Sequence, residues 1–452
     1  MGRDRVSRVA RVTVAIASAL VLMVSVTGWA ASTRYLSGIA QVNVFNGLGA
    51  SNIYNGGPTN ILVVGSDDRS GLSTKQRNRL HAGPDDYGRH TDTMMLVHLG
   101  GDLGTVSVVS IPRDSLVTIP AHTAGDGTPV AEHQGKINSA FSTGGPAVTV
   151  QTVEQATGLT IDHYVEVNFA GFLSMVDAVG GVEVCLTTPL QDELSGLDLP
   201  AGRQTISGPQ ALSYVRARYI DNDFGRAGRQ QKFLSAMAQK AFSSGTLLNP
   251  VALNNFVDAA VHSVTTDERL DRDTIAALAG RAGELDLGNI QFTTIPVTDG
   301  NHMANGESTV LWDSEASAAL FEALAEDQPL PQPPKVTQVE VAPGEISLAV
   351  APAGDQGEHA VADLQKAGFM VTTTAPPAAA PPTTVVRYDP AMPKSLETVK
   401  ASLPAATFQP VPGMGEAFSV VIGNDYAGVT PVRAAATSVE TTVRSAKDDI
   451  CS

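Results

Sequence analysis

The chain has 452 residues, enough for two or three domains, and 43% of them are hydrophobic, so most of the chain can bury an apolar core. Its formal net charge of −16 argues against a nucleic-acid-binding protein, because such proteins usually carry a basic surface. The basic residues of interest are concentrated locally, as expected for a phosphate pocket in an acidic protein.

The N-terminal region contains one long apolar run. Residues 12–31 carry no charge, which predicts a single helix able to cross a bilayer. Four arginines lie in residues 1–11, so the positive-inside rule places that segment in the cytoplasm and the rest of the chain outside it. A cleaved signal peptide is the alternative, because residues 30–32 are small. The run is longer than a usual signal core, so we expect an uncleaved, single-pass anchor in the cell membrane.

The region from 60 to 327 alternates short β-branched runs with amphipathic segments, which is typical of one α/β domain. Residues 32–59, which precede it, show little periodicity and are expected to form a juxtamembrane spacer. The expected strands are 61–64, 93–99, 105–111, 162–169, 182–186 and 290–296. The expected helices are 144–157, 171–179, 208–216, 227–244, 254–264, 274–282 and 313–325.

A Pro-rich stretch at 328–335 predicts a stiff, extended linker to a second, small α/β domain over 336–432. The strands expected there are 346–351, 369–373, 384–387 and 418–422, and the helices are 358–368 and 396–402. Residues 375–382 are expected to be a mobile loop, and residues 433–452 a weakly ordered tail.

Two aspartates stand at ends of neighbouring predicted strands. Asp67 follows the first strand and Asp92 comes just before the second. Two carboxylates so placed, together with phosphate oxygens and water, are typical ligands of Mg²⁺. The alternative is that both are ordinary turn residues.

Basic side chains follow the same pattern. Arg113 comes at the end of a strand-like run, where a solvated ion pair with Asp114 is the alternative. Arginines 216 and 218 would point to one side if their segment is extended. Arg226 and Gln230 share one face at the start of a helix, and Lys136 adds a further charge. Together these residues predict a site for an anionic phosphate substrate.

The motifs around these residues resemble one known family. VVGSDDR, RHTDTMMLVH, VSIPRDSLVTIP, KINSAF, VQTVEQATGLTIDHYVEVNFAGFLSMVDAVGGVEV, ALSYVRARY and DFGRAGRQQ resemble, in this order, the LytR–CpsA–Psr (LCP) family of cell-wall ligases over residues 60–244. EISLAVAP, GFMVTTT, TTVVRYDP and FSVVIGNDYAGV are similar to the LytR C-terminal domain of actinobacterial members, on shorter motifs.

The resemblance implies a fold and an activity. It implies an α/β fold with an LCP-type central mixed sheet flanked by helices, plus a small C-terminal α/β domain. It also implies a phosphotransferase that uses Mg²⁺ or Mn²⁺ to attach a polyprenyl-pyrophosphate-linked glycopolymer to peptidoglycan through a phosphodiester bond. Residues 169–179 and 233–241 would line the groove for the polyprenyl chain, with core packing as the alternative.

The resemblance also assigns site residues by position. Asp67 and Asp92 match the metal ligands. The pyrophosphate-binding set is Arg69, Arg89, Arg113, Lys136, Arg216, Arg218, Asp223, Arg226 and Gln230. The catalytic set is Arg113, Asp92, Arg216 and Arg218. His90 stands where the family usually has Arg, and Asn222 where Gly is common, so either Arg89 or His90 would contact phosphate. The sequence does not name the general base, for which Asp92 is a candidate.

Two other functions fit the same residues. A polyprenyl-pyrophosphate phosphatase would use water as the acceptor, and an envelope lipid-binding protein or attenuator would have no turnover. For a ligase, arabinogalactan on a decaprenyl carrier is the first candidate donor. Cys185 and Cys451 lie too far apart in sequence for a zinc motif, but after export they would be able to form a disulfide.

Overall fold

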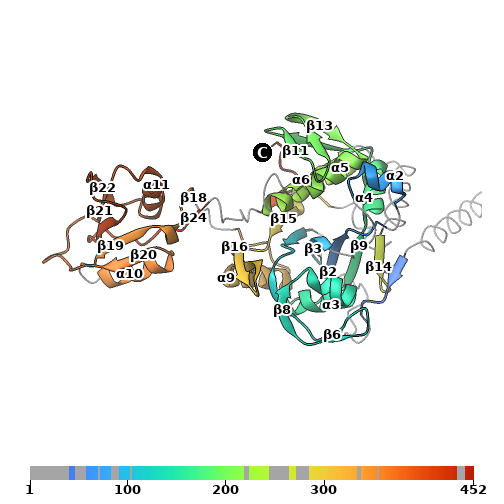
Figure 1. The fold of residues 1–452 in the computed structure, drawn as a ribbon, viewed down its shortest axis with the longest axis horizontal. Coiled ribbons are helices and arrows are strands. Elements are labelled where there is room, and N and C mark those ends of the chain that lie inside the picture. The colour runs from blue at the N-terminus through green and yellow to red at the C-terminus, as the bar shows by residue number, and fades with distance from the viewer. Residues whose placement is uncertain are drawn as a thin grey trace, which may run out of the picture. The chain divides into compact units, whose positions relative to one another are not determined.

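The computed structural model describes residues 40–45, 57–69, 72–82, 91–101, 104–217, 223–243, 264–270, 285–332, 337–353, 356–434 and 443–451. The chain divides into two compact units (Figure 1). The first unit comprises residues 1–295, 314–331 and 441–452, and the second comprises 296–313 and 332–440.

The first unit is built on an eight-stranded mixed sheet. Its order is β1 (Ala40–Val42), β14 (Val264–Asp267), β9 (His163–Val167), β2 (Thr59–Ser66), β3 (Thr91–Leu99), β4 (Val106–Ile111), β15 (Ile290–Thr294) and β25 (Arg444–Ser445). β2 is parallel to β9, β4 is parallel to β15, and β3 is antiparallel to both β2 and β4. The carboxyl ends of β2, β4, β9 and β15 therefore meet the amino end of β3 at one edge of the sheet.

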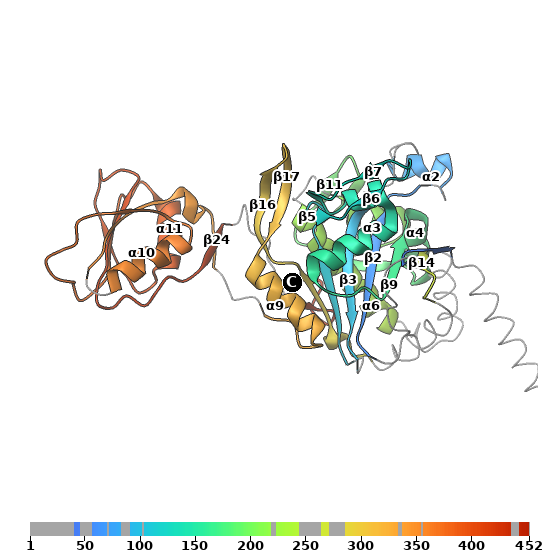
Figure 2. The same cartoon turned by 90° about the horizontal axis from the view of Figure 1, so that it is seen from below.

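Helices cover both faces of this sheet (Figures 1 and 2). On one face lie α4 (Phe169–Ala178), α5 (Gly208–Arg216) and α6 (Asp223–Ser243), and on the other lies α3 (Ser139–Thr157). α3 begins five residues before the predicted helix, and Gly145, at φ 70°, kinks it where the prediction started the helix. Glycine reaches that left-handed conformation without the steric cost of a Cβ.

Short hairpins fill the rest of the first unit. β5 (Leu116–Ile119) pairs with β8 (His133–Lys136), β6 (His122–Thr123) with β7 (Pro129–Val130), β10 (Val182–Leu186) with β13 (Gly202–Ile206), and β11 (Leu190–Asp192) with β12 (Leu197–Leu199). The unit also contains α2 (Thr74–Arg79), η1 (Leu287–Asn289) and α9 (Ser314–Ala325). Apart from β10 and α9, the sequence did not predict these elements, because each is only two to six residues long and too short for a clear apolar period.

The second unit contains a five-stranded sheet in the order β20 (Met370–Thr373), β19 (Ser347–Ala351), β23 (Phe418–Val421), β21 (Val385–Tyr388) and β22 (Thr407–Pro410). Two helices, α10 (Gln356–Lys366) and α11 (Pro393–Ser402), accompany it, and Leu364, Val399 and Phe418 belong to its buried core. It also includes β16 (Val297–Ala304) with β17 (Glu307–Trp312), β18 (Thr337–Val339) with β24 (Val432–Ala434), and η2 (Pro343–Glu345). The predicted fold class, a helix-flanked mixed sheet plus a small α/β domain, is thus confirmed.

The structure differs from the predicted boundaries in three places. β1 lies inside the predicted spacer and pairs with β14, and residues 296–313 group with the second unit. The predicted weakly ordered tail is wrong for residues 443–451. There β25 pairs with β15, Ala446 and Ile450 are buried, and Cys451 forms a disulfide with Cys185. These long-range contacts order a segment whose own sequence has little periodicity.

The predicted membrane helix at residues 12–31 lies outside the described residues, as does the predicted helix at 274–282. The predicted helix at 254–264 also lies outside them, except for Val264, which begins β14. Within the described part of the chain, no helix has the length and apolar character needed to cross a bilayer.

Candidate functional site

Three charged residues lie at the edge of the sheet where β2 and β4 end and β3 begins. Asp67 directly follows β2, Asp92 is the second residue of β3, and Arg113 follows β4 by two residues. The register places Ser66 opposite Thr91 and Met94 opposite Ile111. Antiparallel pairing of β3 with both neighbours therefore brings these residues together across 46 positions of sequence, from Asp67 to Arg113.

A chain of alternating charges runs along this edge. Arg113 Nη1 donates to Asp92 Oδ1 at 2.7 Å, and Arg113 Nε lies 3.6 Å from Asp114 Oδ2. Lys136 Nζ lies 3.6 Å from Asp114 Oδ1, because the β5–β8 hairpin returns Lys136 to this edge. The Arg113 side chain is only 19% exposed and also contacts Asp92. It therefore does not form the simple solvated ion pair with Asp114 that was the alternative.

The first turns of α6 add two buried polar side chains. Arg226, 5% exposed, donates from Nη2 to the backbone oxygen of Asp92 at 3.1 Å. Gln230, 9% exposed, donates to Thr93 Oγ1 at 2.9 Å and to Val215 O at 3.1 Å. The i, i+4 spacing puts both on one helix face, as predicted, and that face meets β3.

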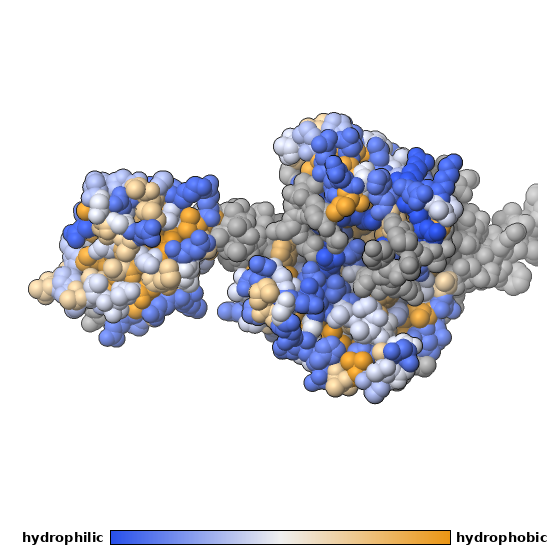
Figure 3. All heavy atoms as spheres, viewed as in Figure 1, coloured by the Kyte–Doolittle hydropathy of each residue, from blue (hydrophilic) through white to orange (hydrophobic). Residues whose placement is uncertain are grey.

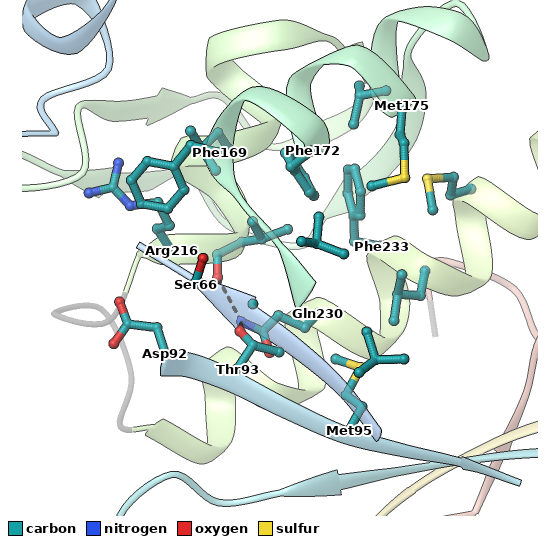
Figure 4. A pocket seen from close by; sticks show the side chains of 18 of the residues that line it. Ser66, Asp92, Thr93, Met95, Phe169, Phe172, Met175, Arg216, Gln230 and Phe233 are labelled. Atoms are coloured by element: carbon teal, nitrogen blue, oxygen red, sulfur yellow. Dashed lines mark hydrogen bonds between the residues drawn. The ribbon is translucent and has the colours of Figure 1, made fainter. Parts of the chain in front are cut away.

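Arg216 occupies the last turn of α5. Its Nη1 donates to Leu80 O at 3.0 Å, and its guanidinium carbon lies 4.7 Å from the centre of the Phe169 ring (Figure 4). The sequence would have aligned arginines 216 and 218 on one side only if their segment were extended. Residue 216 is instead helical. Tertiary contacts with Leu80 and Phe169 orient this guanidinium instead.

The remaining predicted residues fall into two groups. Asp67 Oδ2 lies 3.5 Å from Arg69 Nη2, with the side chains 11% and 13% exposed, so this pair is mostly buried. Arg89, His90 and Arg218 lie outside the described residues, and so does the side chain of Asp223, whose backbone begins α6. Their predicted roles stay predictions.

A cavity of about 380 Å³ opens between the sheet and helices α4, α5 and α6. Its polar end contains Ser66, Asp92, Thr93, Asn168, Arg216, Arg226 and Gln230. Its walls are apolar and include Met95, Phe169, Phe172, Met175, Val215, Phe233, Leu234 and Met237 (Figure 4). The two helical segments expected to line a lipid groove thus do line this cavity. An apolar chamber with charge at one end suits an amphiphilic ligand.

Ser66, Thr93 and Asn168 were missed by the sequence interpretation. Ser66 is 2% exposed, and its Oγ has no hydrogen-bond partner among the described residues. Asn168 accepts from Gly171 N at 2.8 Å and thereby caps α4. Gly65 was a usable signal, because a Cβ there would lie 3.1 Å from Thr93 Cβ. The glycine permits close approach of β2 and β3 at the polar end of the cavity.

Metal binding would depend on few protein ligands. Within the described residues, no group of three or more His, Cys, Asp or Glu side chains is placed to hold an ion. Asp67 and Asp92 at one sheet edge nevertheless suit Mg²⁺, which usually keeps water and phosphate ligands besides one or two carboxylates. The residues therefore fit a metal bridged by substrate rather than one enclosed by protein.

Comparison with known proteins identifies the family. The LytR_cpsA_psr family model matches residues 24–326, and the model described as LytR cell envelope-related transcriptional attenuator matches residues 354–426. The chain is 39% identical over 310 residues to the probable cell wall biosynthesis protein LcpB of Corynebacterium glutamicum. The aligned stretch covers 68% of this chain and 69% of LcpB.

Two further proteins are similar over shorter or more divergent stretches. The polyisoprenyl-teichoic acid–peptidoglycan teichoic acid transferase TagU of Bacillus mycoides is 33% identical over 204 residues, or 45% of this chain and 59% of TagU. Protein gbs0355 from Streptococcus agalactiae superposes with a TM-score of 0.50 at 21% identity, over 63% of this chain and 93% of its own, which bears on the fold alone. By the long family match and the similarity to LcpB, the chain belongs to the LytR–CpsA–Psr family.

Proposed function

We propose that this protein is a phosphotransferase that moves a glycopolymer from a polyprenyl-pyrophosphate carrier onto peptidoglycan. One observation carries the proposal: Asp92, Arg216 and Arg226 line the polar end of the apolar cavity, and Arg113 is hydrogen-bonded to Asp92 there. A donor with a hydrocarbon tail and a pyrophosphate would place its tail against the apolar walls and its pyrophosphate at the cationic end. The relative TagU is named a polyisoprenyl-teichoic acid–peptidoglycan teichoic acid transferase, which supports the choice of donor and acceptor.

Different residues of the cavity would bind the two parts of the donor. The tail would lie against Phe172, Phe233 and the other apolar walls, where burial of hydrocarbon is favourable by about 25 cal/mol per Å². Arg113, Arg216 and Arg226 would contact the pyrophosphate oxygens, since a guanidinium binds such oxygens in pairs. The contacts of these arginines with Asp92 and Leu80 hold their planes in place before the donor arrives.

The reaction would be an in-line displacement at phosphorus. A sugar hydroxyl of peptidoglycan attacks the phosphorus nearest the glycan, a new P–O bond forms, and the bond to the departing polyprenyl phosphate breaks. Positioning and charge neutralisation supply most of the catalysis in such transfers. Asp92, with its side chain 40% exposed, is the most accessible carboxylate of the cluster and the first candidate to accept the hydroxyl proton.

A divalent cation, Mg²⁺ or Mn²⁺, would neutralise phosphate charge when bound, with Asp67 and Asp92 as its protein ligands. The carboxylate of Asp67 lies 3.5 Å from the guanidinium of Arg69, which would hold it at this edge. Asp92 would then contact both Arg113 and the cation, and the contact with Asp114 would keep Arg113 oriented.

The location would be the outer side of the cell membrane, with residues 12–31 as the anchor. The charge pattern of the N-terminus supports that orientation, and the disulfide between Cys185 and Cys451 supports an oxidising compartment. Arabinogalactan stays our first candidate polymer, from the actinobacterial character of the C-terminal domain sequence.

The test uses the full chain reconstituted in vesicles with a lipid-linked, isotopically labelled donor, with and without peptidoglycan. A ligase transfers label to peptidoglycan and releases polyprenyl phosphate only when the acceptor is present. Release of polyprenyl phosphate at the same rate without peptidoglycan would instead identify a phosphatase. Binding of the donor with no turnover in either case would identify a lipid-binding envelope protein.

A further inference from the structure

A basic surface lies on the segment 72–82, outside the cavity. Lys75, Arg77 and Arg79 belong to α2, and residues 72–82 contain no carboxylate, although the whole chain carries a net charge of −16. Lys75 and Arg79 are exposed and Arg77 is half-buried. None of the three lines the cavity. The strongly hydrophilic surface over α2 is visible in Figure 3, and the pyrophosphate site does not account for it.

This segment is attached to the wall of the cavity. Leu72, Leu80 and Ala82 are buried in the core cluster that also contains residues of α4, α5 and α6. Leu80 also accepts, through its backbone oxygen, the hydrogen bond from Arg216. The basic surface is therefore held at the polar end of the cavity.

An exposed leucine lies in a turn that packs against the segment 72–82. Leu194, 62% exposed, is in the turn between β11 and β12. The same turn packs on the residue after α2's C-cap, because a Cβ on Gly196 would lie 2.6 Å from His81 Cδ2. Glu193 is the one carboxylate in residues 193–196. Lys75 and Arg79 share one face of α2 at i, i+4, whereas the half-buried Arg77, two positions from each, does not. The resulting docking surface, defined as Lys75, Arg79 and Leu194, combines two cations with an exposed apolar side chain.

We propose that this docking surface binds the phosphate headgroups of an anionic lipid bilayer and holds the polar end of the cavity at the membrane. Lysines and arginines near such a bilayer each strengthen association by about fivefold, and an apolar side chain among them enters the interface. A soluble polyanion would gain nothing from Leu194. The proposal rests on the proposed function in one respect only, the assignment of the cavity to a lipid tail. A carrier lipid would then enter the cavity with little of its tail crossing water.

Hydrogen–deuterium exchange on the full chain tests the proposal. The protein is placed in nanodiscs of pure phosphatidylcholine or of phosphatidylcholine rich in phosphatidylglycerol. Amides of 72–82 and 193–196 should exchange more slowly in the anionic nanodiscs, and high salt should remove the difference. Changing Lys75→Gln and Arg79→Gln together should weaken docking by about tenfold or more and abolish the protection.

Two further variants separate charge from apolar contact. Leu194→Ser should reduce the protection without changing its salt dependence, and it should still fold because its side chain is exposed. Lys447→Gln is the matched control, since Lys447 is a 70% exposed lysine of the same unit and should leave the protection unchanged.

Equal exchange in both nanodiscs would overturn the proposal. So would protection that requires a soluble, phosphate-rich wall polymer and does not appear with anionic lipid, because the surface would then bind the polymer. The readout needs no turnover. Protection without transfer would therefore overturn the proposed function while leaving the docking surface intact.

Discussion

The guanidinium of Arg113 donates from Nη1 to Asp92 Oδ1 at 2.7 Å, although the two residues are 21 positions apart in the chain. This contact joins β3 to the loop after β4 beside the polar end of the cavity, which Asp92 lines. It links one predicted metal ligand to one predicted phosphate ligand. The two groups are therefore coupled, and changes at either should alter binding of the pyrophosphate.

Replacement of Arg113 by lysine should remove most of the transfer activity. Lysine keeps the charge but has no planar fork for two phosphate oxygens, and loss of one such transition-state contact costs about 2–4 kcal/mol. The measurement is the initial rate of label transfer, with thermal unfolding as the check on folding. Arg203→Lys is the control, because Arg203 also contacts two carboxylates but is 52% exposed on the surface. A normal rate for Arg113→Lys would mean that diffuse positive charge is sufficient.

The two aspartates should behave differently when changed to asparagine. Both changes should abolish Mg²⁺-dependent turnover. Asp92→Asn should keep its stability within about 1 kcal/mol, because that side chain is 40% exposed. Asp67→Asn should cost about 1–3 kcal/mol, because it withdraws a carboxylate from the mostly buried Arg69. Urea unfolding and a Mg²⁺ titration of the rate measure the two effects. Full activity in both variants would exclude these carboxylates as metal ligands.

The Ser66→Ala change should lower activity by about tenfold or more without loss of stability. The Ser66 hydroxyl is buried at the polar end of the cavity and lacks a hydrogen-bond partner among the described residues. It is therefore placed to donate to a phosphate oxygen, and its removal leaves no buried group unpaired. Thr91→Val is the matched control, because Thr91 Oγ1 is likewise buried without a partner in the described structure but does not line the cavity. Equal effects of the two changes on the rate would assign Ser66 a structural role.

Removal of the disulfide should destabilise the first unit. Cys185 and Cys451 close a loop with a sequence separation of 266 residues, for which chain entropy gives an upper value of about 4–5 kcal/mol. The Cys185→Ser, Cys451→Ser double variant should therefore unfold at a lower temperature than the oxidised protein. A reductant should lower the unfolding temperature of the native chain and leave that of the double variant unchanged. Two free thiols in peptide maps of protein from an oxidising compartment would contradict the bond.

Stability should respond to pH through Asp162. Burial raises the pKa of its carboxyl above the usual value of 3.8, although the hydrogen bond from Asn60 N acts in the opposite direction. A raised folded-state pKa contributes stability below the unfolded pKa, and that stability is lost as the pH rises through the folded pKa. Asp162→Asn keeps an acceptor for Asn60 and cannot ionise. The variant should therefore gain stability relative to the native chain between about pH 4 and pH 7, measured by urea unfolding. A constant difference across that range would contradict the assignment.

The sequence alone determined the elements whose apolar pattern is strong. The apolar, β-branched runs in 61–64 and 105–111 and the helical period in 208–216 correspond to β2, β4 and α5. In the second unit, β19, β20, β21, β23, α10 and α11 were predicted from similar patterns, whereas β16, β17, β18, β22 and β24 were not. Local backbone preference and burial of an apolar face both act over a few residues, so a short stretch of sequence is enough to recognise them. The family motifs likewise predicted the charged site residues one by one.

Only the tertiary structure decided which of those residues meet and how they are oriented. β3 lies between β2 and β4, so Asp92 reaches Arg113, and α6 packs on β3, so Arg226 and Gln230 reach the same edge. The order of the tail was decided in the same way, since residues 443–451 are held by β15, α6 and Cys185 rather than by a pattern of their own. The physical reason is that strand order, disulfide pairing and buried hydrogen bonds join residues far apart in the chain, and no local window of sequence contains both partners.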